Sequence, residues 1–187
     1  DLAGALTDID TAIRLDPHSA TAFNNRGQLR LGQGDVAGAW ADYDAAIRLD
    51  PGFGQALNNR GVLRERQGDT SAALADYDTA IRLDPRDAVT LNNRGLLRYR
   101  LDDVAGARTD FESAVGHDPN FAMALRNRGF VRAEHGDPEG AREDYDAAIR
   151  LNPSDADLFD SRARLRARFG DAAGAQADFA TAKRLRS

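Results

Sequence analysis

The sequence predicts an all-α protein made of tandem antiparallel helix pairs, and three regularities indicate this fold. A proline returns every 34 residues, an aromatic segment such as YDAAI or FESAV precedes most of these prolines, and Gly-Asp steps divide the intervals. The prolines are Pro17, Pro51, Pro85, Pro119 and Pro153. A fixed period of this size is typical of a stacked array, in which each unit buries its apolar face against its neighbours.

The Gly-Asp steps are predicted to separate the first helix of each repeat from the second. Glycine tolerates the left-handed conformation that ends a helix, and aspartate accepts hydrogen bonds from the free N–H groups that begin the next. Asp102-Asp103 lacks the glycine, so we expect a less regular turn there. The regular steps are Gly34-Asp35, Gly68-Asp69, Gly136-Asp137 and Gly170-Asp171. The proline of each repeat then ends the second helix.

Small residues recur on the faces where the two helices of a repeat should meet. They allow close approach, and the aromatic residues of the second helices are expected to fill the space beside them. The glycines are Gly27, Gly61, Gly95 and Gly129, and the alanines in register are Ala39, Ala73, Ala107 and Ala141. The aromatic residues are Tyr43, Tyr77, Phe111, Tyr145 and Phe179.

With this period and these residues, the chain resembles the tetratricopeptide repeat family over essentially its whole length. The resemblance rests on Phe23 and Phe159, Gly27, Ala39 and Ala46, Tyr43, and Pro51. It implies a right-handed superhelical solenoid of about eleven helices. A single array is expected over 1–187, with the second helix of a partial repeat at 1–19 and whole repeats at 20–53, 54–87, 88–121, 122–155 and 156–187, the last of them two residues short.

The ends of the sequence suggest a longer assembly. The chain begins inside a repeat, and no polar capping helix follows Ser187. Solenoids usually need such a cap. We therefore expect either a fragment of a longer array or self-association through uncapped ends, with a natural terminus and frayed ends as the alternative.

Paired arginines lie on the inward face of each first helix. Each whole repeat also has an aspartate just before its aromatic residue, so we predict half-buried ion pairs such as Arg26–Asp42. The alternative is a phosphate or nucleic-acid stripe. The arginines are Arg26/Arg30, Arg60/Arg64, Arg94/Arg98, Arg128/Arg132 and Arg162/Arg166, and the aspartates are Asp42, Asp76, Asp110, Asp144 and Asp178.

Asparagines are predicted to face the opposite side, which lines the concave groove in this family. A side-chain amide has one acceptor and two donors, so a row of them can hold a peptide backbone. The row resembles the asparagine ladder of O-linked N-acetylglucosamine transferase; the alternative is that each amide ties neighbouring repeats together. The main row is Asn25, Asn59, Asn93 and Asn127, flanked by Asn24, Asn58 and Asn92 and interrupted at Ser161.

The remaining groove positions are mixed in character. They favour a peptide ligand with apolar side chains and some acidic residues, although some of the apolar ones could pack between repeats instead. The basic residues that a chaperone-type carboxylate clamp needs are absent. The apolar positions are Val62, Val89, Leu96, Tyr99, Met123 and Phe130, the basic ones Arg66, Arg100, Arg126, Arg164 and Arg168, and the acidic ones Glu65, Glu134, Asp157 and Asp160.

Composition excludes several classes of function. The net charge of -5 argues against bulk attraction to nucleic acid or membranes, no apolar run is long enough to insert in a bilayer, and the lack of cysteine excludes thiol chemistry. The three histidines form no metal or triad spacing. We therefore predict no enzyme activity, no cofactor and no metal.

The predicted function is a scaffold that binds an extended peptide or a segment of a partner protein in the groove. Two alternatives stay open: the substrate-recognition arm of a larger enzyme such as a glycosyltransferase or protease, and a self-assembling structural array. The expected location is cytoplasmic, and a periplasmic location stays open for a native N-terminus that precedes Asp1.

Overall fold

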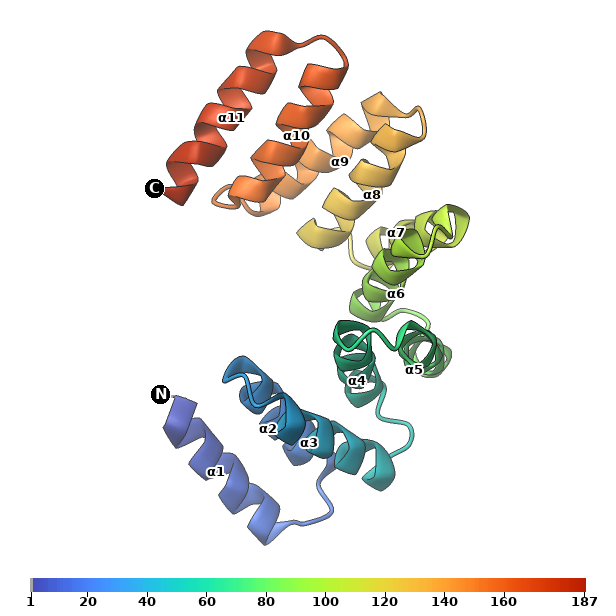
Figure 1. The fold of residues 1–187 in the computed structure, drawn as a ribbon, viewed down its shortest axis with the longest axis vertical. Coiled ribbons are helices and arrows are strands. Elements are labelled where there is room, and N and C mark those ends of the chain that lie inside the picture. Colours follow the sequence, from blue (N-terminus) through green and yellow to red (C-terminus); the bar gives the residue numbers. More distant parts are fainter. Residues whose placement is uncertain (1) are drawn as a thin grey trace. The chain divides into compact units, whose positions relative to one another are not determined.

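The structure is a computed structural model, and it describes residues 2–187. These residues form eleven α-helices, with no strand among them (Figure 1). The helices are α1 (Leu2–Leu15), α2 (Ala20–Gly32), α3 (Val36–Leu49), α4 (Gly54–Arg66), α5 (Thr70–Leu83), α6 (Ala88–Arg100), α7 (Val104–His117), α8 (Ala122–Glu134), α9 (Pro138–Leu151), α10 (Ala156–Arg168) and α11 (Ala172–Arg186).

The helices pack as antiparallel pairs. The most extensive contacts join α2 to α3, α4 to α5, α6 to α7, α8 to α9 and α10 to α11, and α1 packs on α2 (Figure 1). Each first helix has 13 residues and each second helix 14 or 15. The predicted all-α fold of helix pairs is therefore confirmed.

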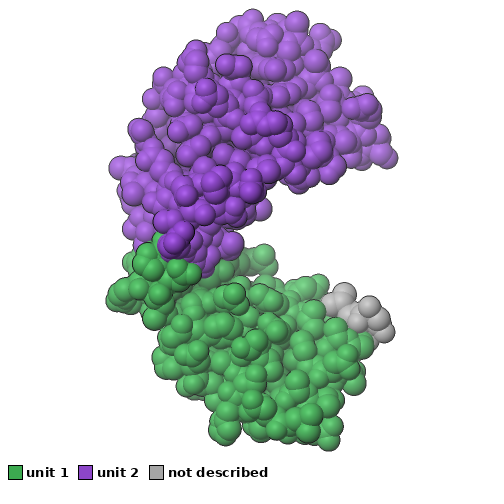
Figure 2. All heavy atoms as spheres, turned by 180° about the vertical axis from the view of Figure 1, so that it is seen from behind, with its two compact units in different colours: residues 1–85 green, residues 86–187 purple. Residues whose placement is uncertain are grey.

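Cα packing divides the chain into two compact units (Figure 2). One unit runs to Pro85 and contains α1 to α5, and the other runs from Arg86 to Ser187 and contains α6 to α11. Each unit is a stack of helix pairs in which the second helix of one repeat contacts the first helix of the next. The single array over 1–187 with the boundaries given above stays a prediction.

The turns within the repeats use the predicted caps. The Asp35 carboxylate accepts a hydrogen bond from the Gly38 N–H at 2.8 Å, and the N-cap aspartates of α5, α7, α9 and α11 each accept from a backbone N–H of the first turn at 2.8 to 3.2 Å. The preceding glycines have φ between 83° and 90°. In this left-handed region a glycine has no Cβ to clash.

The turn at Asp102 was expected to be irregular, and this expectation is wrong. Asp102 adopts φ 66°, in the left-handed region that the glycines occupy. The Asp103 N–H donates to the Arg98 carbonyl at 2.9 Å, as the Asp35 N–H does to Arg30. The short polar side chain of aspartate tolerates this conformation, so the turn keeps its shape at the cost of local strain.

The first four whole helix pairs are each closed by a glycine against an aromatic ring. A Cβ on Gly27 would lie 2.6 Å from Cε1 of Tyr43, and one on Gly61 would lie 2.7 Å from Cε1 of Tyr77. Both rings are buried. The prediction fails in the last repeat, where Phe179 is 42% exposed and Ala163 replaces the glycine. The last pair is therefore closed by smaller side chains.

Candidate functional site

The inward arginines form the predicted ion pairs in every whole repeat. Asp42 is buried, and it accepts bonds from Arg26 Nε at 3.0 Å, Arg26 Nη2 at 2.6 Å and Arg30 Nη1 at 2.8 Å. The same arrangement recurs at Asp76, Asp110, Asp144 and Asp178. One carboxylate thus forms ion pairs with two guanidinium groups. These bonds support the structural interpretation of the arginines over that of a phosphate or nucleic-acid stripe along all repeats.

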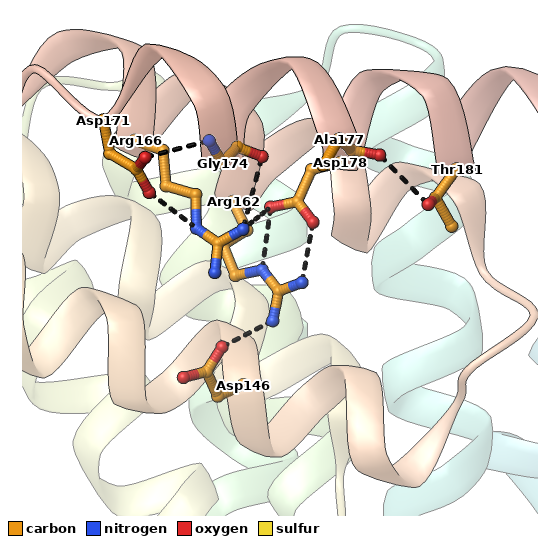
Figure 3. Close-up of polar contacts among 8 residues, drawn as sticks. All are labelled: Asp146, Arg162, Arg166, Asp171, Gly174, Ala177, Asp178 and Thr181. Atoms are coloured by element: carbon orange, nitrogen blue, oxygen red, sulfur yellow. Dashed lines mark hydrogen bonds and ion pairs between the residues drawn. The ribbon is translucent and has the colours of Figure 1, made fainter.

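A second carboxylate links one repeat to the next. Figure 3 shows Arg162 of α10 held by Asp178 in its own repeat and by Asp146 of α9, whose Oδ1 lies 2.6 Å from Arg162 Nη1. Arg26 reaches Asp10 of α1 at 2.7 Å, and Arg60 reaches Asp44 of α3 at 3.1 Å. A bond to an aspartate of a neighbouring repeat was an expectation for Arg30 and its equivalents, but the first arginine of the repeat makes it.

The junction of α7 and α8 lacks this link. Glu112 occupies the position that an aspartate holds in α1, α3, α5 and α9, but it accepts a bond from Arg108 Nε at 2.8 Å on its own helix. Arg128 of α8 bonds Asp144 at 2.9 Å and 2.6 Å through Nε and Nη2. Within the described residues its Nη1 has no partner.

The asparagines tie repeats together. Asn59 Nδ2 donates to Asn24 Oδ1 at 2.9 Å, and Asn127 Nδ2 donates to Asn92 Oδ1 at 2.8 Å. In both cases the asparagine directly before the first arginine of a repeat donates to an asparagine of the previous repeat. These bonds match the alternative interpretation of the series, a tie between neighbouring helices.

The predicted orientation of the flanking asparagines needs correction. Asn24 and Asn92 are 1% and 0% exposed, and Asn58 is buried too, so their side chains do not line an open groove. In the main row Asn25 is exposed, Asn59 and Asn93 are half-buried, and Asn127 is buried, so its predicted exposure to the groove also needs correction. The helix turns 100° per residue, so adjacent asparagines cannot both face solvent once one packs against the neighbouring repeat.

The predicted apolar groove residues are open in the unit from Arg86 to Ser187. Val89, Met123 and Phe130 are 48%, 51% and 44% exposed. The rings of Tyr99 and Phe130 meet edge to face at 5.3 Å between centroids. Leu96 and Tyr99 also pack on the buried core of Phe111 and Val131, so they connect the patch to the core. Val62, in the other unit, is half-buried.

A pocket of about 510 Å³ lies beside this patch, between α8 and α10. It combines an exposed ring with charges of both signs. From the predicted site it takes Arg126, Asn127 and Phe130. The other lining residues are Ala133, Glu134, Tyr145, Asp157, Asp160, Ser161, Arg164, Leu165 and Arg168.

Most charges of this pocket are paired with one another. Arg168 bonds Glu134. Arg186, from the last turn of α11, bonds Asp157 at 2.7 Å and Asp160 at 2.5 Å. Together with the two other arginines of the lining, these guanidinium groups outnumber the three carboxylates, so the pocket does not repel an anion.

Two arginines remain available to a ligand. Arg126 approaches Asp157 only to 3.9 Å. Arg164 is exposed and makes no hydrogen bond or ion pair within residues 2–187. The pocket therefore presents Arg164 as a cation for an incoming carboxylate, beside the exposed Phe130 ring.

Tyr145 closes the floor of the pocket. Burial raises the pKa of its hydroxyl to about 12, an effect that the nearby Arg126 partly opposes. The phenol is therefore neutral at physiological pH. It offers packing and a hydroxyl donor rather than an acid or base for chemistry.

The arginines that line the pocket were predictable from the sequence, but the pairing of Arg186 with the acidic residues of the pocket was not. Arg186 lies 29 positions from Asp157, outside the repeat register, so no periodic signal predicted their contact. Ser161, expected to interrupt the asparagine row, turns its hydroxyl to the Asp157 carbonyl at 2.8 Å on its own helix.

No group of three or more His, Asp or Glu side chains in the described part of the chain is arranged to hold a metal ion. No helix among residues 2–187 is both long and apolar enough to cross a membrane.

Comparison with known families identifies a repeat along most of the chain. Profiles described as tetratricopeptide repeat match residues 1–52, 26–88, 66–124 and 122–155. A comparison with curated proteins found no match.

Solved structures share the fold at low sequence identity. YrrB, described as a TPR protein with an unusual peptide-binding site, is 20% identical over 95% of this chain and 91% of its own, with a TM-score of 0.68. PilF of Pseudomonas aeruginosa is 22% identical over 88% and 75%, with a TM-score of 0.80. A chain of the Cut9–Hcn1 hetero-tetramer of APC/C is 16% identical over 99% and 37%, with a TM-score of 0.88.

Proposed function

Since the chain belongs to the tetratricopeptide repeat family, we propose that it is a protein-interaction scaffold that binds an extended segment of a partner protein. The proposed surface is the exposed face of α6, α8 and α10 in the unit from Arg86 to Ser187. The observation that carries this proposal is the 510 Å³ pocket, which pairs an exposed aromatic ring with an unpaired arginine.

The apolar half of the surface supports a hydrophobic anchor in the ligand. Met123 and Phe130 are about half exposed, and Tyr99 supports the Phe130 ring from the side. Exposed apolar patches rimmed by polar residues mark interaction sites, because burying them on binding releases water. A leucine-sized or aromatic side chain of the partner fits this role.

The polar half supports an acidic residue next to that anchor. Arg164 offers its guanidinium fork without an internal competitor, and Arg126 is only weakly engaged. A guanidinium binds a carboxylate through two parallel hydrogen bonds, which adds orientation as well as affinity. The ligand class is therefore a peptide with an apolar residue followed or preceded by Asp or Glu.

Asn127 adds a contact to the ligand backbone. Its Nδ2 already donates to Asn92, and the residue lines the pocket. An amide has one acceptor and two donors, so Oδ1 is left to accept a backbone N–H from the peptide. In this proposal Asn127 serves both the repeat stack and the ligand, and the exposed Asn25 holds the corresponding place in α2.

A random peptide display library selected on the purified chain tests the function. We expect enrichment of sequences that combine an acidic with an apolar residue. Phe130→Ser and Arg164→Ser should each weaken binding of a selected peptide roughly tenfold, as measured by fluorescence anisotropy. Arg142→Ser, an exposed arginine of α9 outside the pocket, makes the same charge change and should leave affinity unaltered.

Selected peptides without acidic residues, whose affinity survives both pocket substitutions, would show that the ligand binds elsewhere. In that case the scaffold would use another face of the helices. The proposal that a partner lies on α8 and α10 would then be abandoned.

A further inference from the structure

The irregular junction between α7 and α8 leaves one strong donor unused. The first arginine of a repeat bonds its own aspartate through Nε and Nη2, and its Nη1 reaches back to the previous repeat. This backward bond is present at Arg26, Arg60 and Arg162. Arg128 keeps only the first pair of bonds, and among the described residues nothing accepts from its Nη1.

The cause is the extra methylene of Glu112. The other junctions have an aspartate at this position, whose short side chain points its carboxylate across to the next repeat. Glu112 is longer and more flexible, and it pairs instead with Arg108 one turn away on α7. The Glu112 carboxylate therefore pairs with Arg108 and not with Arg128.

A small cavity lies beside Arg128 and Arg108, between α7 and α8. Its volume is about 30 Å³, enough for one water-sized group such as a single oxygen of an oxyanion. It is lined by Arg108, Arg128, Val131, Arg132, His135 and Asp137. Three guanidinium groups and an imidazole thus surround a space that has a single carboxylate on its wall.

That carboxylate is already in use. Asp137 caps α9 by accepting from the Gly140 N–H at 2.9 Å, and it lies 3.6 Å from Arg132 Nε. The Asp144 carboxylate is buried and shared between Arg128 and Arg132. The cavity therefore has cationic donors in excess of free acceptors.

We propose that this cavity is an oxyanion site that accepts a phosphate group. One phosphate oxygen enters the cavity and accepts from Arg128 Nη1, in the place that aspartate occupies at other junctions. The remaining oxygens face Arg108, which is 64% exposed, and the exposed His135. Guanidinium groups match the geometry of phosphate oxygens, and several of them around one anion add their effects.

A phosphate bound at this site would connect two neighbouring repeats. It bridges α7 and α8 as Asp146 bridges α9 and α10, so binding links the third whole repeat to the fourth. A ligand that binds only the folded chain stabilises it by mass action. Phosphate should therefore raise the unfolding temperature more than chloride of the same ionic strength.

The test is a phosphate titration of the whole chain at constant ionic strength, followed by NMR of the arginine Nε–H groups. We expect saturable shifts at Arg108 and Arg128 at millimolar phosphate. Glu112→Asp restores the aspartate of the other junctions, and its carboxylate should accept a hydrogen bond from Arg128 Nη1. The Glu112→Asp variant should therefore bind phosphate roughly tenfold more weakly, with an unchanged fold.

Two controls sharpen the result. Arg142→Gln removes an exposed arginine of α9 that does not line the cavity and should leave the titration unaltered. Asp146→Glu copies the irregular junction at Arg162 and should create a second, weaker phosphate response there. Shifts that never saturate, or that Glu112→Asp leaves intact, would overturn the proposal.

Inorganic phosphate and phosphoserine serve as parallel probes of the phosphate source. Equal affinity supports a site for free phosphate, and tighter binding of phosphoserine supports a site for a phosphate group carried by a larger molecule. Failure of both to bind at Arg128 refutes the site.

Discussion

The junction of α9 with α10 and the junction of α7 with α8 use the same arginine in different ways. At the first, Arg162 bonds Asp178 in its own repeat and Asp146 in the previous one (Figure 3). At the second, Arg128 bonds Asp144 alone. The difference between aspartate and glutamate at one position decides whether a carboxylate joins two repeats or only two turns of one helix.

This comparison separates two tasks that one guanidinium performs. The bonds to Asp144 or Asp178 lie inside a helix pair and are made in both junctions, so they stabilise the repeat itself. The Nη1 bond crosses between repeats and is optional. Stability within a repeat and coupling between repeats can therefore be altered separately, and substitutions at the two junctions measure each.

The largest effect is expected from removing the carboxylate inside a repeat. Asp144→Ala leaves Arg128 without any carboxylate partner and should lower the free energy of unfolding by about 3 kcal/mol. Asp178→Ala should cost about 2 kcal/mol, because Arg162 retains Asp146. Urea unfolding followed by far-UV circular dichroism measures both. Equal costs would mean that the bond between repeats contributes nothing.

Alkaline pH should affect the repeat of α8 and α9 more than the repeat of α6 and α7. Burial raises the pKa of Tyr145 from 10.0 to about 12, whereas the corresponding Phe111 does not ionise. Between these pH values the unfolded chain loses the Tyr145 proton and the folded chain keeps it, so the free energy of unfolding falls as pH rises.

Tyr145→Phe removes this contribution, which amounts to up to about 2 kcal/mol between pH 10 and pH 12. Unfolding curves of both proteins across this range measure it. The variant should lose less stability than the wild type, and an identical slope would contradict the assignment. Tyr43, whose pKa burial also raises to about 12, remains as an internal reference.

Exchanging the carboxylates of the two junctions should reverse their behaviour. Glu112→Asp is expected to stabilise the chain by about 0.5 kcal/mol, and Asp146→Glu should destabilise it by a similar amount, because each pair is partly solvent-exposed. Unfolding temperatures at low salt, where surface electrostatics are strongest, measure the change. A shift of the same sign in both variants would contradict the claim that aspartate at this position stabilises the junction more than glutamate does.

The smallest effect concerns the turn that leads into α7. Asp102→Gly relieves a left-handed aspartate but adds flexibility to the unfolded chain, so a net gain of about 0.5 kcal/mol is expected. Gly34→Asp makes the opposite change in the turn between α2 and α3 and should cost a similar amount. Calorimetric unfolding of both variants checks the prediction, and a destabilised Asp102→Gly would show that the aspartate side chain has a role of its own.

The fold was predictable because its signals repeat. The 34-residue spacing and the aspartate caps recur in all five whole repeats, and the fit of a glycine such as Gly27 against an aromatic ring recurs in four. The ion pair of Arg26 with Asp42 was predictable for the same reason, since both residues return in fixed register.

The candidate site was only partly predictable. Helical periodicity gave the direction of Phe130 and Arg164, but it could not show that Asn24 turns into the neighbouring repeat to bond Asn59. Burial between repeats depends on tertiary packing rather than on the period of a single helix. The pairing of Arg186 with Asp157 was likewise hidden, because it occurs once and has no repeated counterpart.

The shared carboxylate also bears on how fast the chain can fold. Arg162 and Arg166 find Asp178 only 16 and 12 residues away, and every whole repeat has the same short separations. Chains dominated by such local contacts have low contact order and fold rapidly. Because each repeat carries a complete set of these partners, folding can begin in any helix pair and spread to its neighbours.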